Sequence, residues 1–133
     1  MPSGRCHCGA VKYRVEGEQI YSAICHCEDC RRSAGAVMVG WAAYPAAALT
    51  VEQGETREFA SSECGRRHFC PVCGTGLFYY NEATLPGIVD VQLTTFDNPE
   101  DYPPDIHVQT ADELSWEAQL GEMPRFERYP SPD

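Results

Sequence analysis

The sequence predicts a mainly β fold with few short helices, and two observations carry this prediction. Glycine and proline together make up 21 of the 133 residues and are spread throughout, so they divide the chain into short pieces. Turn signals recur about every ten residues between runs rich in β-branched and aromatic side chains, a spacing typical of a sheet-rich domain. The length fits one domain and no linker divides it, so we expect a single domain over residues 1–133.

The expected strands follow one another along the chain. Residues 10–15 (AVKYRV) alternate between apolar and polar side chains and end near Gly17, which is typical of a strand with one buried face. Residues 88–93 (IVDVQL) alternate in the same way. Shorter apolar and aromatic runs predict further strands at 37–41, 49–52 and 76–80, and two more at 56–59 and 68–70 on either side of a polar loop.

Helical signals are weak and short. Residues 45–48 predict one turn, with proline at an early helical position, and residues 28–34 predict another directly after a cysteine pair. Residues 97–104 are rich in proline and acidic side chains and predict a loop. Residues 122–133 contain three prolines, and we expect this tail to lie extended over the surface.

Charge is distributed unevenly along the chain. The formal net charge is −10, and all of it comes from residues 81–133, since residues 1–80 balance eight acids with eight basic side chains. This balance argues against nucleic-acid and anionic membrane partners, which are bound mainly through Lys and Arg. No apolar run approaches the roughly 20 residues of a membrane helix. No secretory signal follows Met1, so we expect a cytoplasmic, reducing compartment.

The eight cysteines are the first feature to explain. Leu, Ile, Val and Phe total only 24 residues, and a chain with so thin an aliphatic core usually gains stability from cross-links or metal. Clustered cysteines in a reducing compartment bind metal more often than they form disulfides. We therefore interpret the cysteines as metal ligands.

Two of the three cysteine clusters end in Cys-Gly. A glycine after a metal-binding turn can adopt positive φ and let backbone N–H groups approach the thiolates. These clusters therefore predict one closed, structural zinc site with four thiolate ligands. Its ligands are Cys6, Cys8, Cys70 and Cys73.

The remaining cluster offers three thiolates, Cys25, Cys27 and Cys30, from one short loop. Three protein ligands and an open position are the usual form of a catalytic zinc site. A second structural site with a fourth ligand elsewhere is the alternative. Cys64 is that possible fourth ligand, a redox partner or a surface thiol. His26, between two of these cysteines, is expected to point away from the metal and support the site.

Three motifs occur in a specific order. They are Gly4–Val11 (GRCHCGAV) with Tyr13, Cys25–Arg31 (CHCEDCR) and Arg67–Leu77 (RHFCPVCGTGL). Together they resemble the glutathione-dependent formaldehyde-activating enzyme family, which also includes centromere protein V. Residues 104–108, Trp116 and residues 120–126 are similar to that family's weaker C-terminal pattern.

The resemblance implies a β-tent-type fold with two Zn²⁺ per chain. It assigns the structural zinc to Cys6, Cys8, Cys70 and Cys73, and the second, catalytic zinc to Cys25, Cys27 and Cys30. It also implies condensation of formaldehyde with glutathione, or with another small thiol, to S-(hydroxymethyl)glutathione or its analogue, a carbon–sulfur lyase activity. Candidate contacts to the carboxylates of glutathione are Arg31, Arg32, Arg66 and Arg67.

Two other functions remain as alternatives. A non-catalytic, zinc-stapled binding module is suggested by the acidic C-terminal part with Tyr102, Trp116, Phe126 and Tyr129, although core packing is the simpler expectation for these side chains. A thiol redox or zinc-responsive protein is suggested by Cys64 and by the cysteine pair at 27 and 30, but no thioredoxin-like βαβ pattern accompanies them.

Overall fold

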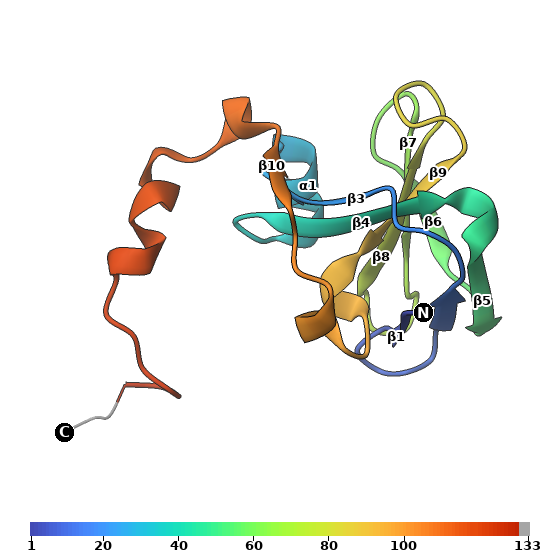
Figure 1. Ribbon diagram of the computed structural model, residues 1–133, viewed down its shortest axis with the longest axis horizontal. Helices are drawn as coiled ribbons and strands as arrows, with labels where there is room; N and C mark the ends of the chain where they lie inside the picture. The colour runs from blue at the N-terminus through green and yellow to red at the C-terminus, as the bar shows by residue number, and fades with distance from the viewer. Residues whose placement is uncertain (131–133) are drawn as a thin grey trace.

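The computed structural model describes residues 1–130, which form two β-sheets with few short helices (Figure 1). The three-stranded sheet has the order β1-β2-β5, and the seven-stranded sheet has the order β10-β3-β4-β9-β8-β7-β6. Neighbouring strands are antiparallel except β10 and β3, which are parallel. The predicted mainly β fold is confirmed.

The elements have the following bounds. The strands are β1 (Ser3–Arg5), β2 (Lys12–Val15), β3 (Tyr21–Cys25), β4 (Val39–Pro45), β5 (Leu49–Gln53), β6 (Arg57–Ala60), β7 (Gly65–Phe69), β8 (Gly76–Asn81), β9 (Ile88–Gln92) and β10 (Ile106–Val108). The α-helix is α1 (Glu28–Ala34). The 3-10 helices are η1 (Ala46–Ala48), η2 (Leu93–Thr95), η3 (Pro99–Asp101), η4 (Thr110–Asp112) and η5 (Ser115–Glu122).

Most predicted elements are present with small shifts at their ends, and α1 has the predicted bounds. The strands β1, β3 and β10 and the 3-10 helices η2, η3, η4 and η5 were not predicted, and η3 lies in residues 97–104, which were expected to form a loop. β1 and β10 are only three residues long; β1 pairs with β2, the next strand, and β10 pairs with the distant β3. β3 runs directly into the cysteine motif, and in its sequence YSAIC polar and small residues are buried, so it lacks a clear apolar alternation.

The main core contains the first cysteine of each pair in the four-cysteine set, Cys6 and Cys70. Tyr13 of β2 and Phe78 of β8 pack edge to face, with 5.1 Å between ring centroids. Cys6 and Cys70 belong to the same buried cluster. A second, smaller cluster consists of Cys25, Cys30, Val39 and Trp41. Each cysteine set therefore has two members buried among apolar side chains.

Caps at both ends fix helix α1 next to the second cysteine set. Cys27 is its N-cap, and its Sγ accepts a hydrogen bond from the backbone N–H of Cys30 at 3.3 Å. Glu28 and Asp29 occupy the first turn, where negative charge is favoured by the helix dipole. Gly35 ends the helix with φ 62°. The spacing of Cys27 and Cys30 is thus set by the helix start.

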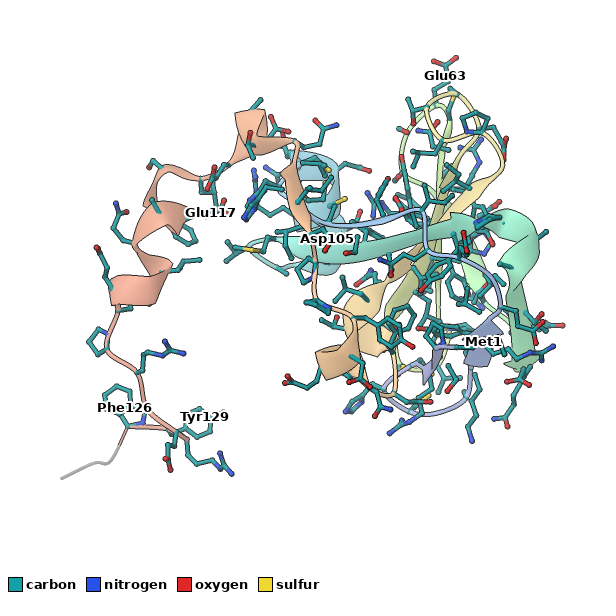
Figure 2. The ribbon with its side chains drawn as sticks, in the orientation of Figure 1. Met1, Glu63, Asp105, Glu117, Phe126 and Tyr129 are labelled. Atoms are coloured by element: carbon teal, nitrogen blue, oxygen red, sulfur yellow. The ribbon has the colours of Figure 1, made fainter. Side chains whose placement is uncertain are left out.

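After β10 the chain leaves the body of the domain, as Figure 1 shows for the segment that contains η5. The tail was expected to lie over the surface, but Figure 2 shows Phe126 and Tyr129 at the far end of this segment, apart from the sheets. Its large apolar side chains Trp116, Met123 and Phe126 are at least half exposed, so the segment buries little apolar surface against the body. Residues 131–133 of the predicted tail lie outside the described residues.

The expected core packing of the C-terminal aromatic residues is correct only for Tyr102, whose ring lies 5.0 Å from that of Phe96. Trp116, Phe126 and Tyr129 are 50%, 59% and 94% exposed. Within residues 1–130, no helix is long and apolar enough to cross a membrane.

Candidate functional site

The first cysteine set brings together the ends of distant elements. Cys6 and Cys8 follow β1, and Cys70 and Cys73 lie between β7 and β8. The four sulfur atoms lie within 4.8 Å of one another, with Cys6 Sγ 3.7 Å from Cys8 Sγ and Cys8 Sγ 3.9 Å from Cys70 Sγ. Tetrahedral zinc with bonds of about 2.3 Å places its sulfur ligands about 3.8 Å apart. The donor set therefore fits zinc.

The two turns of this set supply backbone donors to the sulfur atoms. Gly9 and Gly74 have φ 81° and 83°, as the Cys-Gly pattern predicted. Val11 N–H donates to Cys6 Sγ at 3.3 Å, and Val72 N–H donates to Cys70 Sγ at 3.4 Å. These N–H groups point partial positive charge at the sulfurs and so favour the thiolate form that binds metal.

The second cysteine set lies where β3 ends and α1 begins. The sulfur atoms of Cys25, Cys27 and Cys30 lie within 4.8 Å of one another. A hydrogen bond from Cys25 and the nearby guanidinium of Arg67 lower the pKa of Cys30 to about 5 despite its burial, whereas the same bond to Cys30 raises the pKa of Cys25. The guanidinium of Arg67 therefore favours a thiolate in this cysteine set. Three convergent sulfurs fit an open, three-thiolate metal site.

A cavity of about 530 Å³ adjoins this second set, and all three cysteines form part of its wall. The volume falls within the roughly 300–1,000 Å³ of small-molecule sites. In the first set, Cys6 and Cys70 are buried in the main core, and Cys6 also lines a smaller cavity of about 350 Å³. The second set differs in that all three of its cysteines lie in the wall of one cavity.

Much of the cavity wall is one row of residues across the seven-stranded sheet. Arg67 of β7 pairs with Tyr79 of β8, and Tyr79 pairs with Asp90 of β9. Asp90 pairs with Ala43 of β4, which pairs with Tyr21 of β3. Directly paired residues of neighbouring strands point to the same face of a sheet. The register therefore turns Arg67, Tyr79, Asp90 and Tyr21 toward the cavity, and all four line it.

Arg67 links this row to the second cysteine set. Its Nη2 donates to Asp29 Oδ2 and lies 3.5 Å from Cys30 Sγ. Its guanidinium carbon lies 4.7 Å from the centroid of the Tyr79 ring, a cation–π contact. The side chain is 90% buried, so its positive charge acts on the cysteine sulfurs with little screening by solvent.

Asp90 is the buried acid of the cavity and was not predicted as a site residue. It is 6% exposed, and burial raises its pKa to about 7, with the negative charge of Cys30 acting in the same direction. Asp90 stands between Val89 and Val91 in the sequence, and this alternation indicates that its side chain points to the other face of the sheet. Only the strand register shows that this face is the cavity wall.

His26 attaches the C-terminal segment to the second cysteine set. It is 1% exposed, with Nδ1 2.7 Å from Glu117 Oε1 and Nε2 2.8 Å from His107 Nδ1. Glu117 points from its segment toward the body (Figure 2), and its Oε2 accepts a hydrogen bond from Leu114 N–H. His26 forms a third group of potential ligand side chains with Glu113 and Glu117, separate from the cysteines. No local pattern could have paired positions 26 and 117.

The other candidate residues lie away from the cavity wall. Arg31 donates to the Asp112 carbonyl, Arg32 pairs with Glu28 one helical turn away, and Arg66 donates to backbone carbonyls near the β6–β7 turn. Cys64 is exposed in that turn and belongs to neither cysteine set. Of the four candidate arginines, the structure brings only Arg67 to the cavity.

Known proteins share this sequence pattern and fold. Residues 1–112 match the family model described as glutathione-dependent formaldehyde-activating enzyme. A Halomonas elongata protein named "Putative glutathione-dependent formaldehyde-activating enzyme" is 31% identical over 140 residues, covering 96% of this chain and 87% of that protein. An uncharacterized lyase of Schizosaccharomyces pombe is 28% identical over 91 residues, 68% of this chain and 66% of that protein.

A crystal structure of a Rhodobacter sphaeroides protein is similar in fold. The TM-score is 0.62 at 24% sequence identity, and the match covers 80% of this chain and 99% of that chain. At this level of identity the likeness concerns the fold alone.

Proposed function

The chain belongs to the glutathione-dependent formaldehyde-activating enzyme family, and from this premise we propose that it is a zinc-dependent carbon–sulfur lyase. Its proposed reaction joins formaldehyde to glutathione, or to another small thiol, and forms the S-hydroxymethyl adduct. The observation that carries the proposal is the position of Cys25, Cys27 and Cys30 in the wall of a 530 Å³ cavity. Cys6 of the four-cysteine set also lines a cavity, but four sulfurs leave no zinc position open, whereas three sulfurs leave one.

We assign one zinc ion to each cysteine set. Cys6, Cys8, Cys70 and Cys73 would hold the structural ion and join β1 to the β7–β8 turn. Cys25, Cys27 and Cys30 would hold the second ion and leave one position open toward the cavity. Zinc bound in this way supplies Lewis acidity, which lowers the pKa of a coordinated thiol and makes it a nucleophile at neutral pH.

The residues around the second set prepare the cavity for a thiol. Arg67 offsets the negative charge of the cysteine sulfurs, and Asp29 and Tyr79 hold its guanidinium in place. The indole of Trp41, 4% exposed, packs with Cys25 and Cys30 and keeps water from that side of the cluster. The hydrogen bond between His26 Nδ1 and Glu117 Oε1 holds the residue between Cys25 and Cys27 in place.

The test is the rate of adduct formation by zinc-loaded protein. Adduct formation also proceeds without an enzyme, so exchange between ¹³C-formaldehyde and its glutathione adduct is followed by NMR at equilibrium with and without protein. We expect an added exchange rate that scales with protein concentration. Cys27→Ser should abolish it, because one of the three thiolates of the open site is lost.

A matched thiol control separates the open site from general cysteine chemistry. Cys64→Ser removes an exposed sulfur outside both sets and should leave the added rate unchanged, which also tests whether Cys64 is a fourth ligand. If glutathione and two other small thiols all give no rate above the uncatalysed reaction, the enzymatic proposal is wrong, and the binding-module and redox hypotheses remain.

A further inference from the structure

Acidic side chains outnumber basic ones in the wall of the cavity beside the second cysteine set. Among residues 1–130, the wall contains one basic side chain, Arg67, and two acidic side chains, Asp29 and Asp90. The charge of Arg67 is already engaged, because its guanidinium pairs with Asp29 and lies 3.5 Å from Cys30 Sγ. Over the described part of the chain, the wall therefore offers no cation that is free to pair with an anionic ligand.

The metal assigned to this site adds to the excess of negative charge. Three thiolates, from Cys25, Cys27 and Cys30, would leave one net negative charge on a bound Zn²⁺. Asp90 contributes its own negative charge when it is ionised, and its carboxyl group is 6% exposed, so solvent screens this charge weakly. An anionic ligand is therefore repelled as it enters the cavity.

The other arginines near the second set do not correct this imbalance. Arg31 donates to the Asp112 carbonyl, and Arg32 pairs with Glu28 on the surface of α1. Arg66 donates to backbone carbonyls near the β6–β7 turn. These three arginines lie outside the cavity wall. The carboxylates of glutathione, which the sequence would pair with these side chains, therefore have no free partner in the wall within residues 1–130.

The rest of the wall is largely aromatic and aliphatic. Its larger side chains of this kind are Tyr21, Trp41, Tyr79, Leu85 and Val108. All of these except Trp41 are only half-buried, so they keep surface that a ligand can cover. The remaining polar side chains, Ser62, Thr84 and Gln109, are uncharged. Such a wall favours an apolar group, because the group and the wall both lose contact with water when they meet.

We propose that the thiol substrate of this protein carries a small, uncharged, apolar substituent, and that glutathione is a poorer substrate than such a thiol. The inference rests on the proposed function and names its substrate class. The reaction is unchanged: the sulfur of R–SH forms the bond to the formaldehyde carbon, its proton passes to the aldehyde oxygen, and the product is R–S–CH₂–OH. The group R lies against the aromatic and aliphatic wall, and the cysteine set receives the sulfur.

The experiment compares two thiols that differ mainly in charge, 3-mercaptopropionate and its methyl ester. Exchange with ¹³C-formaldehyde is followed by NMR for each thiol and for glutathione. Each kcat/KM is divided by the uncatalysed rate constant of the same thiol, which removes differences in intrinsic reactivity. The normalised value for the ester should exceed that for the acid at least tenfold, the effect of one unit charge on another about 10 Å away in partly buried surroundings. Glutathione should also fall below the ester.

A pair of matched variants locates the cause of the preference. Thr84→Lys places a positive charge at an exposed position of the cavity wall. It should raise the normalised kcat/KM for 3-mercaptopropionate and so lower the preference for the ester to threefold or less. Thr50→Lys makes the same change at an exposed position of β5, in the other sheet. It should keep the preference of the wild type.

A binding measurement gives a readout that does not depend on turnover. The S-methyl thioethers of the same acid and ester have no thiol proton and form no adduct. Their titration is followed at the indole N–H of Trp41, which lines the cavity, with that of Trp116 on the C-terminal segment as internal control. The ester should shift the Trp41 signal with a Kd at least fivefold below that of the acid, and Thr84→Lys should narrow this difference.

The outcomes distinguish the substrate class from the function on which it rests. A wild-type protein that catalyses exchange with glutathione or 3-mercaptopropionate as efficiently as with the ester overturns the substrate class and leaves the proposed function intact. A protein with no added rate for any thiol overturns both. A preference for the ester that Thr84→Lys and Thr50→Lys leave equally unchanged also contradicts the inference, because the charge of the cavity wall is then not its cause.

Discussion

Asp90→Asn should stabilise the folded protein, and the gain should grow as the pH rises. Burial raises the pKa of Asp90 from its ordinary value of 3.8 to about 7, with the charge of Cys30 as the second cause. An acid whose pKa is raised by folding stabilises the folded state while it is protonated, and this contribution is lost as the pH rises through the folded-state pKa. Ionised Asp90 therefore opposes folding, and asparagine removes that opposition.

The magnitude follows from the two pKa values. The full difference corresponds to a ceiling of about 4 kcal/mol, reached above neutral pH. Part of the effect is already present at pH 5, so the advantage of Asp90→Asn over the wild type should increase by about 2–3 kcal/mol between pH 5 and pH 8. Urea unfolding of both proteins, each at the same zinc concentration, measures this difference.

Both proteins carry the same cysteine sets, and the zinc content of each is measured at every pH, because the charge of Asp90 acts on Cys30 and so on metal binding. Asp101→Asn, at an exposed position, should show no change in the free energy of unfolding at any pH. A difference between Asp90→Asn and the wild type that stays constant from pH 5 to pH 8 would mean that Asp90 ionises as easily in the folded chain as in the unfolded one, and would contradict its raised pKa.

Three further predictions concern the metal sets and the C-terminal segment. Cys6→Ala should prevent stable folding, whereas Cys27→Ala should lose one zinc ion and retain the circular dichroism spectrum of the wild type. Equal unfolding of both variants would contradict the assignment of a structural zinc to the first set and a second zinc to the other. Gly74→Ala should lower the free energy of unfolding in urea by about 1–2 kcal/mol, because Gly74 has positive φ. Gly121→Ala should not, since a Cβ there also meets no atom within 4 Å and the φ of Gly121 is not positive. Glu117→Ala should lower the free energy of unfolding, since buried His26 loses the hydrogen-bond partner of its Nδ1, and should speed amide exchange in β10. Unchanged exchange would contradict the attachment of the C-terminal segment through His26.

The sequence predicts the features of the site that depend on nearby residues. The Cys-Gly turns at Gly9 and Gly74 have the expected positive φ, and α1 begins and ends where expected. Both follow from local rules, namely the conformational freedom of glycine and the start of a short helix at Cys27. The same rules give two cysteine sets with four and three sulfurs, which the structure brings together as groups.

The cavity wall could not be predicted because it depends on strand register. Arg31, Arg32, Arg66 and Arg67 are equivalent in the sequence, and only the pairing of β7 with β8 turns Arg67 toward Cys30. Alternation places Asp90 opposite Val89 and Val91, on a face that the sequence would assign to solvent. The row from Arg67 to Tyr21 crosses five strands, and no local pattern contains that information.

The acidic C-terminal part has a different meaning once its residues are placed. In the sequence, the negative charge of residues 81–133 argues against nucleic-acid partners. In the structure, two of these acids, Asp90 and Glu117, are buried near the second cysteine set. Asp90 faces the cavity, and Glu117 accepts hydrogen bonds that lower its pKa despite burial, from Leu114 N–H and then from His26. Its negative charge is therefore partly committed to the second cysteine set, while the exposed acids lie on the surface.

Zinc K-edge X-ray absorption, combined with a zinc count per chain, distinguishes an open three-cysteine site from a closed one. The two cysteine sets predict two zinc ions that share seven cysteine sulfurs, with an average of about 3.5 sulfur ligands per ion. Saturating glutathione should raise this average to about 4, and Cys27→Ser should remove that response. Four protein sulfurs at both ions, or a spectrum that glutathione does not change, would contradict an open three-cysteine site beside the cavity.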